Sequence, residues 1–337
     1  MLSEMEVDRE PGRALRGRAA MRLAIAIGDI SVGLRAASAE DLALPPEMEA
    51  FRVAVSPHAS VRERTPDVAG SELRCDIEIG VERVPRLESA TGRRIFNSGG
   101  VWTAHEGSAG VTFDFTAPVF GREPYKRLCV DRSFRQASLF LNGRCYPRGV
   151  FPLEYPADEL LIMHRLAADN GVEFHACGLV DAESGGHLFL GQSGAGKSTT
   201  ARLWNSIRAV RILSDDRIIV RQGRGTKAAL AFPTTSPSDI RMYGTPWHGE
   251  AEFALPEQAA VSRILILEHG PTNRLQPLSK GRAVAEMFAR CFVPFYSRDH
   301  LEATLACLNE IADALPCYRF EFTPTPSAVE MVLDFHD

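Results

Sequence analysis

The feature that most constrains the fold is an eight-residue motif at residues 191–198, which reads Gly-Gln-Ser-Gly-Ala-Gly-Lys-Ser. It matches the phosphate-binding loop pattern Gly-x-x-x-x-Gly-Lys-Ser/Thr. A short apolar run at residues 187–190 precedes the motif, and helix-forming residues follow it at 201–204. The glycines let the backbone curl, so that several N–H groups point inward beside the positive end of the helix dipole. The sequence therefore predicts a loop that binds a nucleoside triphosphate, and the alternative is a glycine-rich turn that binds nothing.

The motif also predicts which residues hold the nucleotide. Lys197 is expected to reach the β- and γ-phosphates, and the Ser198 hydroxyl is expected to ligate Mg²⁺, so the predicted cofactors are ATP and Mg²⁺. The expected nucleotide-binding residues are Gly191, Ser193, Gly194, Ala195, Gly196, Lys197, Ser198 and Thr199.

Composition limits the class of protein. A chain of 337 residues that is 45% hydrophobic and 24% charged is an ordinary globular protein, long enough for two domains. A formal net charge of −5 makes nucleic acid an unexpected partner, and the absence of a long apolar stretch makes a membrane unexpected too. Seven cysteines without a Cys-x-x-Cys pair indicate reduced thiols in a cytoplasmic protein.

The first half of the chain is predicted to be mostly β. Residues 1–21 are charged throughout and are expected to be a disordered lead-in, followed by a β domain over 22–150 that serves an accessory or substrate-recognition role. Its two histidines, His58 and His105, stand alone without ligand spacing and are expected to have a surface or structural role, with a metal site as the less favoured alternative. The predicted strands lie at residues 23–27, 51–55, 75–81, 111–115, 125–130 and 137–141.

The second half, residues 151–337, is predicted to be an α/β domain built around the phosphate loop. Apolar residues at helical spacing predict helices at 158–169, 279–290, 297–315 and from 327 onward. The predicted strands lie at 172–176, 188–190, 210–213, 217–221, 228–232, 263–267 and 318–322.

Two adjacent acids, Asp215 and Asp216, end one of these predicted strands. On a strand beside the loop strand, such carboxylates would face the γ-phosphate, where one can hold Mg²⁺ and the other can accept a proton from an attacking hydroxyl. The alternative is a turn-forming aspartate pair, because aspartate is favoured in turns.

A third element is His175, which lies in the apolar strand upstream of the loop. The order of these elements, apolar strand with histidine, Gly-x-Ser-Gly-x-Gly-Lys-Ser, helix, Asp-Asp, resembles the HPr kinase/phosphorylase family, which shares a P-loop variant fold with phosphoenolpyruvate carboxykinases. The resemblance covers about residues 155–335 and is strongest over 174–219. It implies a C-terminal P-loop domain of this type, preceded here by a mostly β domain that does not resemble the family's N-terminal domain.

The resemblance also implies roles for single residues. Gly191, Gly194, Gly196 and Lys197 would cradle phosphates, and Ser198 with Asp216 would ligate magnesium. Asp215 would be the general base and His175 would orient it or tune its pKa. Adjacent carboxylates titrate as a coupled pair, so the assignment of base and ligand between the two acids stays open.

A polar and aromatic segment at residues 241–250 looks similar to one in the HPr-kinase-like proteins associated with ribosomal-peptide tailoring. Arg241 could pair with a phosphate or carboxylate, and Trp247 could offer a stacking face. The candidate substrate residues are Arg241, Trp247, His248 and Glu250; a surface loop with an anchoring tryptophan is the alternative.

These observations lead to one expected function and two alternatives. The expected function is a cytoplasmic, Mg²⁺- and ATP-dependent kinase acting on a hydroxyl, with a serine of a peptide or protein as acceptor, and the family implies a homo-oligomer. A P-loop ATPase or nucleotide switch is the second candidate, and a small-molecule kinase or carboxykinase-like enzyme is the third.

Overall fold

The structure is a computed structural model that describes residues 21–54, 75–90, 92–222 and 239–335. The chain forms two compact units: one contains the residues up to Ala26 and Ile30–Arg165, and the other contains Ile27–Asp29 and Leu166 onward. The division falls inside helix α2 (Ala157–Ala168) rather than at residue 150. The lead-in over 1–20 and the strand predicted at 228–232 lie outside the described residues.

The first unit is a mixed, eight-stranded sheet in the order β1-β2-β3-β8-β7-β6-β5-β4. Strand β3 is parallel to both β2 and β8, and the run from β8 to β4 is antiparallel. The strands are β1 (Met21–Ile27), β2 (Ile30–Ala36), β3 (Ile77–Val84), β4 (Arg93–Asn97), β5 (Trp102–Glu106), β6 (Gly110–Phe115), β7 (Lys126–Asp131) and β8 (Gln136–Asn142). A short helix α1 (Pro46–Glu49) and two 3₁₀ turns, η1 (Ala39–Leu42) and η2 (Pro118–Phe120), complete it.

Most of the predicted β runs in this unit are strands, but the described part of the run at residues 51–55, which is 51–54, is not. Phe51 is buried at the end of α1, and Arg52 makes only an isolated bridge to Ile25. Strands β2, β4 and β5 were not predicted. Strand β4 begins with two exposed arginines, and β5 carries polar residues at three of its five positions, so neither shows an apolar pattern. Strand β2 does alternate, with Ile30, Val32, Leu34 and Ala36 buried, and this pattern was missed.

The second unit contains a mixed, ten-stranded sheet with the order β14-β13-β12-β9-β10-β15-β18-β16, and β11 and β17 pair with β9. Strands β10, β15 and β18 are parallel to one another, whereas the remaining pairs are antiparallel. The strands are β9 (Gly171–Asp181), β10 (Gly185–Leu190), β11 (Arg211–Ser214), β12 (Arg217–Gln222), β13 (Ile240–Gly244), β14 (Gln258–Ala260), β15 (Arg263–His269), β16 (Arg274–Pro277), β17 (Cys291–Phe292) and β18 (Cys317–Phe322).

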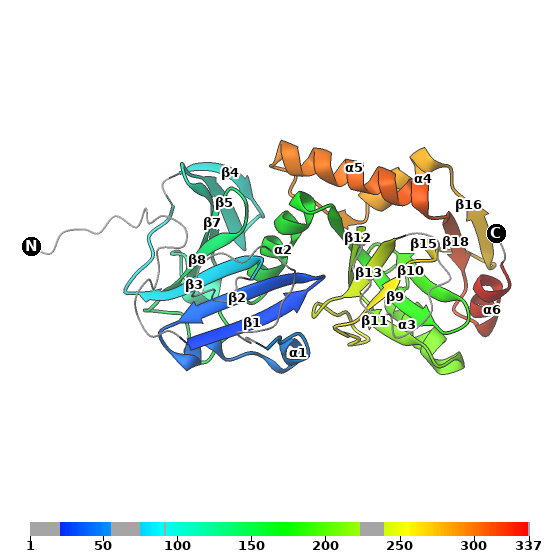
Figure 1. Ribbon diagram of the computed structural model, residues 1–337, viewed down its shortest axis with the longest axis horizontal. Helices are drawn as coiled ribbons and strands as arrows, with labels where there is room; N and C mark the ends of the chain where they lie inside the picture. The colour runs from blue at the N-terminus through cyan, green and yellow to red at the C-terminus, as the bar shows by residue number, and fades with distance from the viewer. Residues whose placement is uncertain (1–20, 55–74, 91, 223–238, 336–337) are drawn as a thin grey trace, which may run out of the picture. The chain divides into compact units, whose positions relative to one another are not determined.

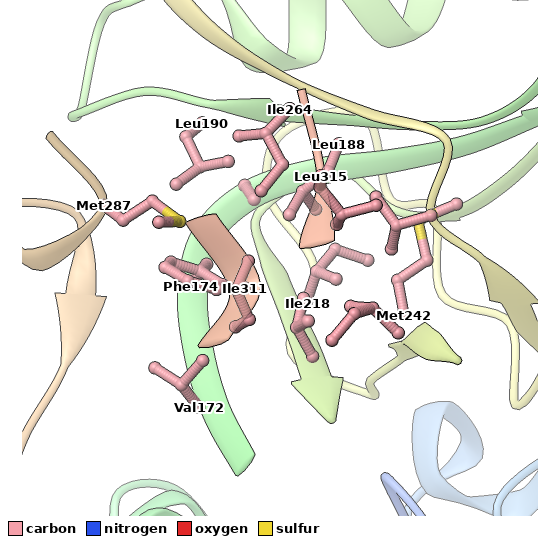
Figure 2. Close-up of a cluster of buried hydrophobic side chains, with 14 of the residues drawn as sticks. Val172, Phe174, Leu188, Leu190, Ile218, Met242, Ile264, Met287, Ile311 and Leu315 are labelled. Carbon is pink, nitrogen blue, oxygen red and sulfur yellow. The ribbon is translucent and has the colours of Figure 1, made fainter. Parts of the chain in front are cut away.

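Helices cover both faces of this sheet (Figure 1). Helices α4 (Lys280–Phe288) and α5 (Arg298–Ala314) pack on one face, and α3 (Lys197–Ile207) and α6 (Pro326–Asp334) pack on the other. Along β10 and β15 successive side chains enter opposite clusters, because side chains alternate between the faces of a strand. Figure 2 shows the first cluster, which includes Val172, Phe174, Leu188, Leu190, Ile218, Met242, Ile264, Met287, Ile311 and Leu315.

The mixed α/β class predicted for the chain is confirmed at this level by two mixed sheets and the six helices α1–α6 of the described residues. Each predicted helix of the second half matches an observed helix to within a few residues. Within the described residues, no helix has the length and apolar character that crossing a membrane requires. All seven cysteines are free thiols.

Candidate nucleotide site

The site forms where the pairing of strand β9 changes on both sides at once. The first half of β9 pairs with β12 and β17, and the second half pairs with β11 and β10. Between these halves, the backbone N–H of Ala176 donates to the Asp216 carbonyl (2.9 Å), and the Gly191 N–H donates to the His175 carbonyl (3.1 Å). The middle of β9 thus holds the acid pair on one side and the start of the phosphate loop on the other.

The loop itself runs from the end of β10 into α3, which is the strand-loop-helix context that the motif requires. Gly194 has φ of 80° and Gly196 has φ of 98°, in the left-handed region that favours glycine. A Cβ at Gly196 would lie 2.6 Å from Cζ of Phe322, so this glycine is also required for space. The turn is closed by the Ala195 N–H, which donates to the Gln192 carbonyl (3.1 Å).

Lys197 is folded back onto the loop. Its ammonium donates to the carbonyls of Gly191 (3.0 Å) and Gln192 (3.1 Å), and only 6% of the residue is exposed. Burial lowers the pKa of Lys197, and Arg217 lowers it further, while Asp216 opposes the shift from 3.9 Å away. The ammonium therefore lies beside the start of the loop, where it is hydrogen-bonded to carbonyl oxygens that a phosphate can replace.

Asp215 is closed off from solvent, with 0% of the residue exposed. Oδ1 accepts the backbone N–H groups of Gly249 (3.0 Å) and Phe253 (3.3 Å), while Oδ2 accepts the Ala251 N–H (3.0 Å) and the Ser198 hydroxyl (2.8 Å). Each oxygen thus has two donors, which uses the acceptor capacity of a carboxylate. This side chain anchors residues 249–253 to helix α3.

Asp216 is the accessible acid of the pair, with 25% of its side chain exposed. Its Oδ1 lies 2.8 Å from Nε2 of His175, and its Oδ2 accepts from the Arg217 guanidinium. Burial raises its pKa, but the hydrogen bond from His175 and the positive charges of Arg217 and Lys197 outweigh this, so that the pKa of Asp216 lies below its usual value. The structure thus pairs His175 with Asp216, and not with Asp215.

Arg217 was not predicted as a site residue. Its guanidinium stacks on the Phe292 ring at 4.3 Å from the centroid and lies 3.6 Å from the Glu173 carboxylate. Phe292 belongs to the two-residue strand β17, which no sequence pattern indicates. The position of Arg217 directly after the acid pair was the available signal, because residues next to the acid pair in the sequence also lie beside it in space.

The Ser198 hydroxyl donates its hydrogen to Asp215, which leaves its oxygen lone pairs for another partner. A hydroxyl oxygen is a hard donor of the kind that Mg²⁺ takes in phosphate-loop proteins, where nucleotide phosphates and water complete the shell. Among the described residues no group of three or more His, Cys, Asp or Glu side chains is gathered to hold a metal. The Ser198 hydroxyl oxygen could thus hold a magnesium ion whose other ligands come from nucleotide phosphates and water.

The predicted substrate segment is divided by the structure. Arg241 lies on β13 and donates to Gln258 (2.7 Å). The Trp247 carbonyl instead accepts from Ser214 (3.2 Å), directly before the acid pair, and the Glu250 carbonyl accepts from Arg202 of α3 (2.8 Å). His248 is exposed between them. The second half of the segment thus borders the acid pair, whereas Arg241 is bonded to β14.

Comparisons with known proteins add no family to this geometry. No protein-family model matches the chain, and a search of the curated proteins finds no relative.

Proposed function

We propose that the protein is a Mg²⁺- and ATP-dependent kinase that transfers the γ-phosphoryl group of ATP to a hydroxyl group. The observation that carries the proposal is the Asp216 carboxylate, which is accessible, bonded to His175 and 3.9 Å from the Lys197 ammonium. A P-loop lysine marks where the γ-phosphate lies, so this carboxylate is beside the atoms that react. An acid in that place suits proton removal from an acceptor hydroxyl.

The step balances with the residues present. The acceptor oxygen attacks the γ-phosphorus, the bond between this phosphorus and the β–γ bridging oxygen breaks, and ADP leaves with the electron pair. The hydroxyl proton passes to the Asp216 carboxylate, which His175 orients through its 2.8 Å bond. Lys197 leaves the loop carbonyls and offsets negative charge on the β- and γ-phosphates.

This proposal moves the role of general base, which the family resemblance implies for Asp215, to Asp216. Asp215 has no exposed surface and its oxygens are already occupied, so it cannot reach an acceptor hydroxyl; we assign the base to Asp216. Asp215 instead holds the Ser198 hydroxyl, whose oxygen would bind Mg²⁺. When bound, the ion would supply charge neutralisation between the β- and γ-phosphates.

The acceptor class rests on the resemblance to HPr-kinase-like proteins. We propose a serine of a peptide or protein as acceptor, a cytoplasmic homo-oligomer as the working form, and the first unit as the part that recognises the acceptor. Trp247, His248 and Glu250 border the acid pair and are the candidates for acceptor contact within the second unit, since Ser214 and Arg202 hold this segment.

The experiment is a phosphotransfer assay on the full chain with Mg²⁺, ATP and a pool of serine-containing peptides. ADP is quantified, and phosphorylated peptides are identified by a mass increase. Asp216→Asn should lower phosphotransfer by about 10²- to 10⁴-fold while ATP binding, measured by calorimetry, stays near wild type. Asp313→Asn, on an exposed ion pair with Lys280, is the matched control and should leave both readouts unchanged.

Two outcomes contradict the proposal. ADP formation that is rapid and independent of every acceptor would point to an ATPase or nucleotide switch. Phosphotransfer that survives Asp216→Asn would remove this carboxylate from the reaction and return the base to another group.

A further inference from the structure

Three parallel strands end at the same edge of the second sheet, and only the first of them leads into the phosphate loop. Leu190, the last residue of β10, pairs in register with Ile266 of β15. Strand β15 continues to His269, which is in register with Phe322 at the end of β18. Because β15 runs three residues past the point where the loop begins, His269 and Phe322 are carried alongside the loop.

Both residues touch the loop. Nε2 of His269 lies 2.8 Å from the Gly194 carbonyl oxygen, and the His269 ring stacks with Phe322 at a centroid distance of 6.1 Å and an interplanar angle of 23°. Phe322 is buried and lies against Gly196, where a Cβ would meet its ring at 2.6 Å. His269 is exposed, so an aromatic ring backed by a second one borders the loop on the side of β15 and β18.

Polar groups that could read a nucleoside follow directly after Phe322. Oδ1 of Asn273 accepts from the N–H (2.8 Å) and the hydroxyl (3.1 Å) of Thr323, and its Nδ2 donates to the Ser327 hydroxyl (3.0 Å). Thr325 lies between them, with its hydroxyl 3.3 Å from that of Thr323 and 3.0 Å from that of Ser327. Thr325 and Ser327 are exposed, so these hydroxyls are available to ribose hydroxyls or base nitrogens.

The direction of a bound nucleotide follows from the charges on the other side of the loop. Lys197 and Asp216 mark the end of the triphosphate chain that reacts, and they lie toward β9 and β11. A chain that enters the loop with its γ-phosphate there leaves on the opposite side. That side is the one occupied by His269 and Phe322.

We propose that His269, backed by Phe322, stacks on the base of the bound nucleoside triphosphate. The Thr325 and Ser327 hydroxyls beside Asn273 form hydrogen bonds with the polar groups of its ribose or base. This inference rests on the proposed function in that both need a nucleotide in the loop. It extends that function by naming the residues that distinguish a nucleotide from a triphosphate that has neither base nor ribose. Stacking on an aromatic side chain contributes substantially to the affinity for a nucleotide, and it accepts any base because every base has an aromatic face.

The test compares ATP with inorganic tripolyphosphate, which has the phosphate chain but neither base nor ribose. Binding of each to the full chain is measured by calorimetry with Mg²⁺ for wild type, His269→Ala and His269→Phe. His269→Ala should weaken ATP binding about tenfold and leave tripolyphosphate binding unchanged. His269→Phe keeps an aromatic face and should restore ATP binding to within about threefold of wild type.

Controls separate this role from support of the loop. His105→Ala, in the first unit, should change neither affinity, and thermal unfolding checks that each variant is folded. If His269→Ala weakens tripolyphosphate as much as ATP, the histidine supports the loop through Gly194 and the inference is overturned. An unchanged ATP affinity in His269→Ala overturns it as well.

The proposed function fails separately from this inference. Wild-type protein that binds neither ligand removes both proposals. Protein that binds ATP with the expected His269 dependence but phosphorylates no hydroxyl removes the kinase and leaves the base site in place.

Discussion

Strands β9 and β10 carry two histidines in contrasting surroundings, His187 near the hairpin that joins the strands and His175 beside the phosphate loop. At the hairpin end, Asp181 accepts from Ser184 and from Arg208, and the Ser184 hydroxyl lies 2.8 Å from Nε2 of His187. His187 is 0% exposed and packs against the Trp204 ring. At the loop end, His175 is bonded to Asp216, and 21% of the His175 side chain is exposed.

The difference lies in what continues the sheet. At the hairpin end, β10 and β11 both pair with β9, and the buried Asp181 and His187 side chains serve the fold. Towards the loop end, β10 ends opposite Ala176 and β11 ends opposite Gly178, and the chain that leaves these strands forms the phosphate loop and the acid pair. A histidine and a carboxylate become available for chemistry where strand pairing breaks, and the same groups are structural where it does not.

The largest expected effect comes from Lys197→Ala at the loop end. Loss of the ammonium removes the positive charge beside the β- and γ-phosphates, so ATP-dependent turnover should fall by about 10²- to 10³-fold or more. The unfolding temperature should stay near that of wild type, because the ammonium bonds to two loop carbonyls and lies 3.9 Å from Asp216, which keeps its bonds to His175 and Arg217 when Lys197 is replaced. Turnover and thermal unfolding are measured together, with Lys280→Ala as the exposed control. ATP-dependent turnover equal to that of wild type would mean that the reaction does not take place at the loop end.

The second effect is on stability and concerns Asp215, the enclosed member of the acid pair at the loop end. Asp215→Asn keeps one acceptor oxygen and replaces the other with an amide N–H₂, so that either the Ala251 N–H or the N–H groups of Gly249 and Phe253 lose their acceptor. Leaving buried donors unpaired should lower the free energy of unfolding by about 2 to 3 kcal/mol. Urea unfolding measures this, and Asp313→Asn should change it little. Stability equal to wild type would show that residues 249–253 do not depend on this carboxylate.

The sequence predicts the parts of this site better than their connections. The motif, the acid pair and His175 are local patterns, and the structure gathers all three at the middle of β9. Which acid is enclosed depends on residues 249–253, more than thirty positions away, whose backbone N–H groups have no sequence signature. The assignment of Asp215 as base was therefore drawn without the contacts that bear on it.

The same reasoning explains the elements that were not predicted. A strand of two residues such as β17 has too few positions to show a period, yet it brings Phe292 to Arg217. His269 ends a buried strand and carries no motif; its place beside the loop follows from the parallel register of β10, β15 and β18. Periodicity predicts elements, whereas register and interruption are tertiary properties.

The smallest expected effect concerns the hairpin end and is seen in how the free energy of unfolding depends on pH. Burial, with a contribution from the Arg263 charge, lowers the pKa of His187 from 6.5 to about 3. Below about pH 6.5 the unfolded chain therefore binds a proton at this histidine that the folded chain does not bind. The free energy of unfolding consequently falls by about 1.4 kcal/mol per pH unit as the pH decreases toward 3. His187→Gln removes this titration, and the difference in unfolding free energy between pH 7.5 and pH 5.5, measured in urea, should shrink by about 1 to 1.5 kcal/mol. The exposed His248→Gln is the control and should keep the wild-type pH dependence. An unaltered pH dependence in His187→Gln would mean that His187 is protonated in the folded chain as readily as in the unfolded chain. The hairpin end would then not be enclosed, and the contrast between the hairpin end and the loop end would be wrong.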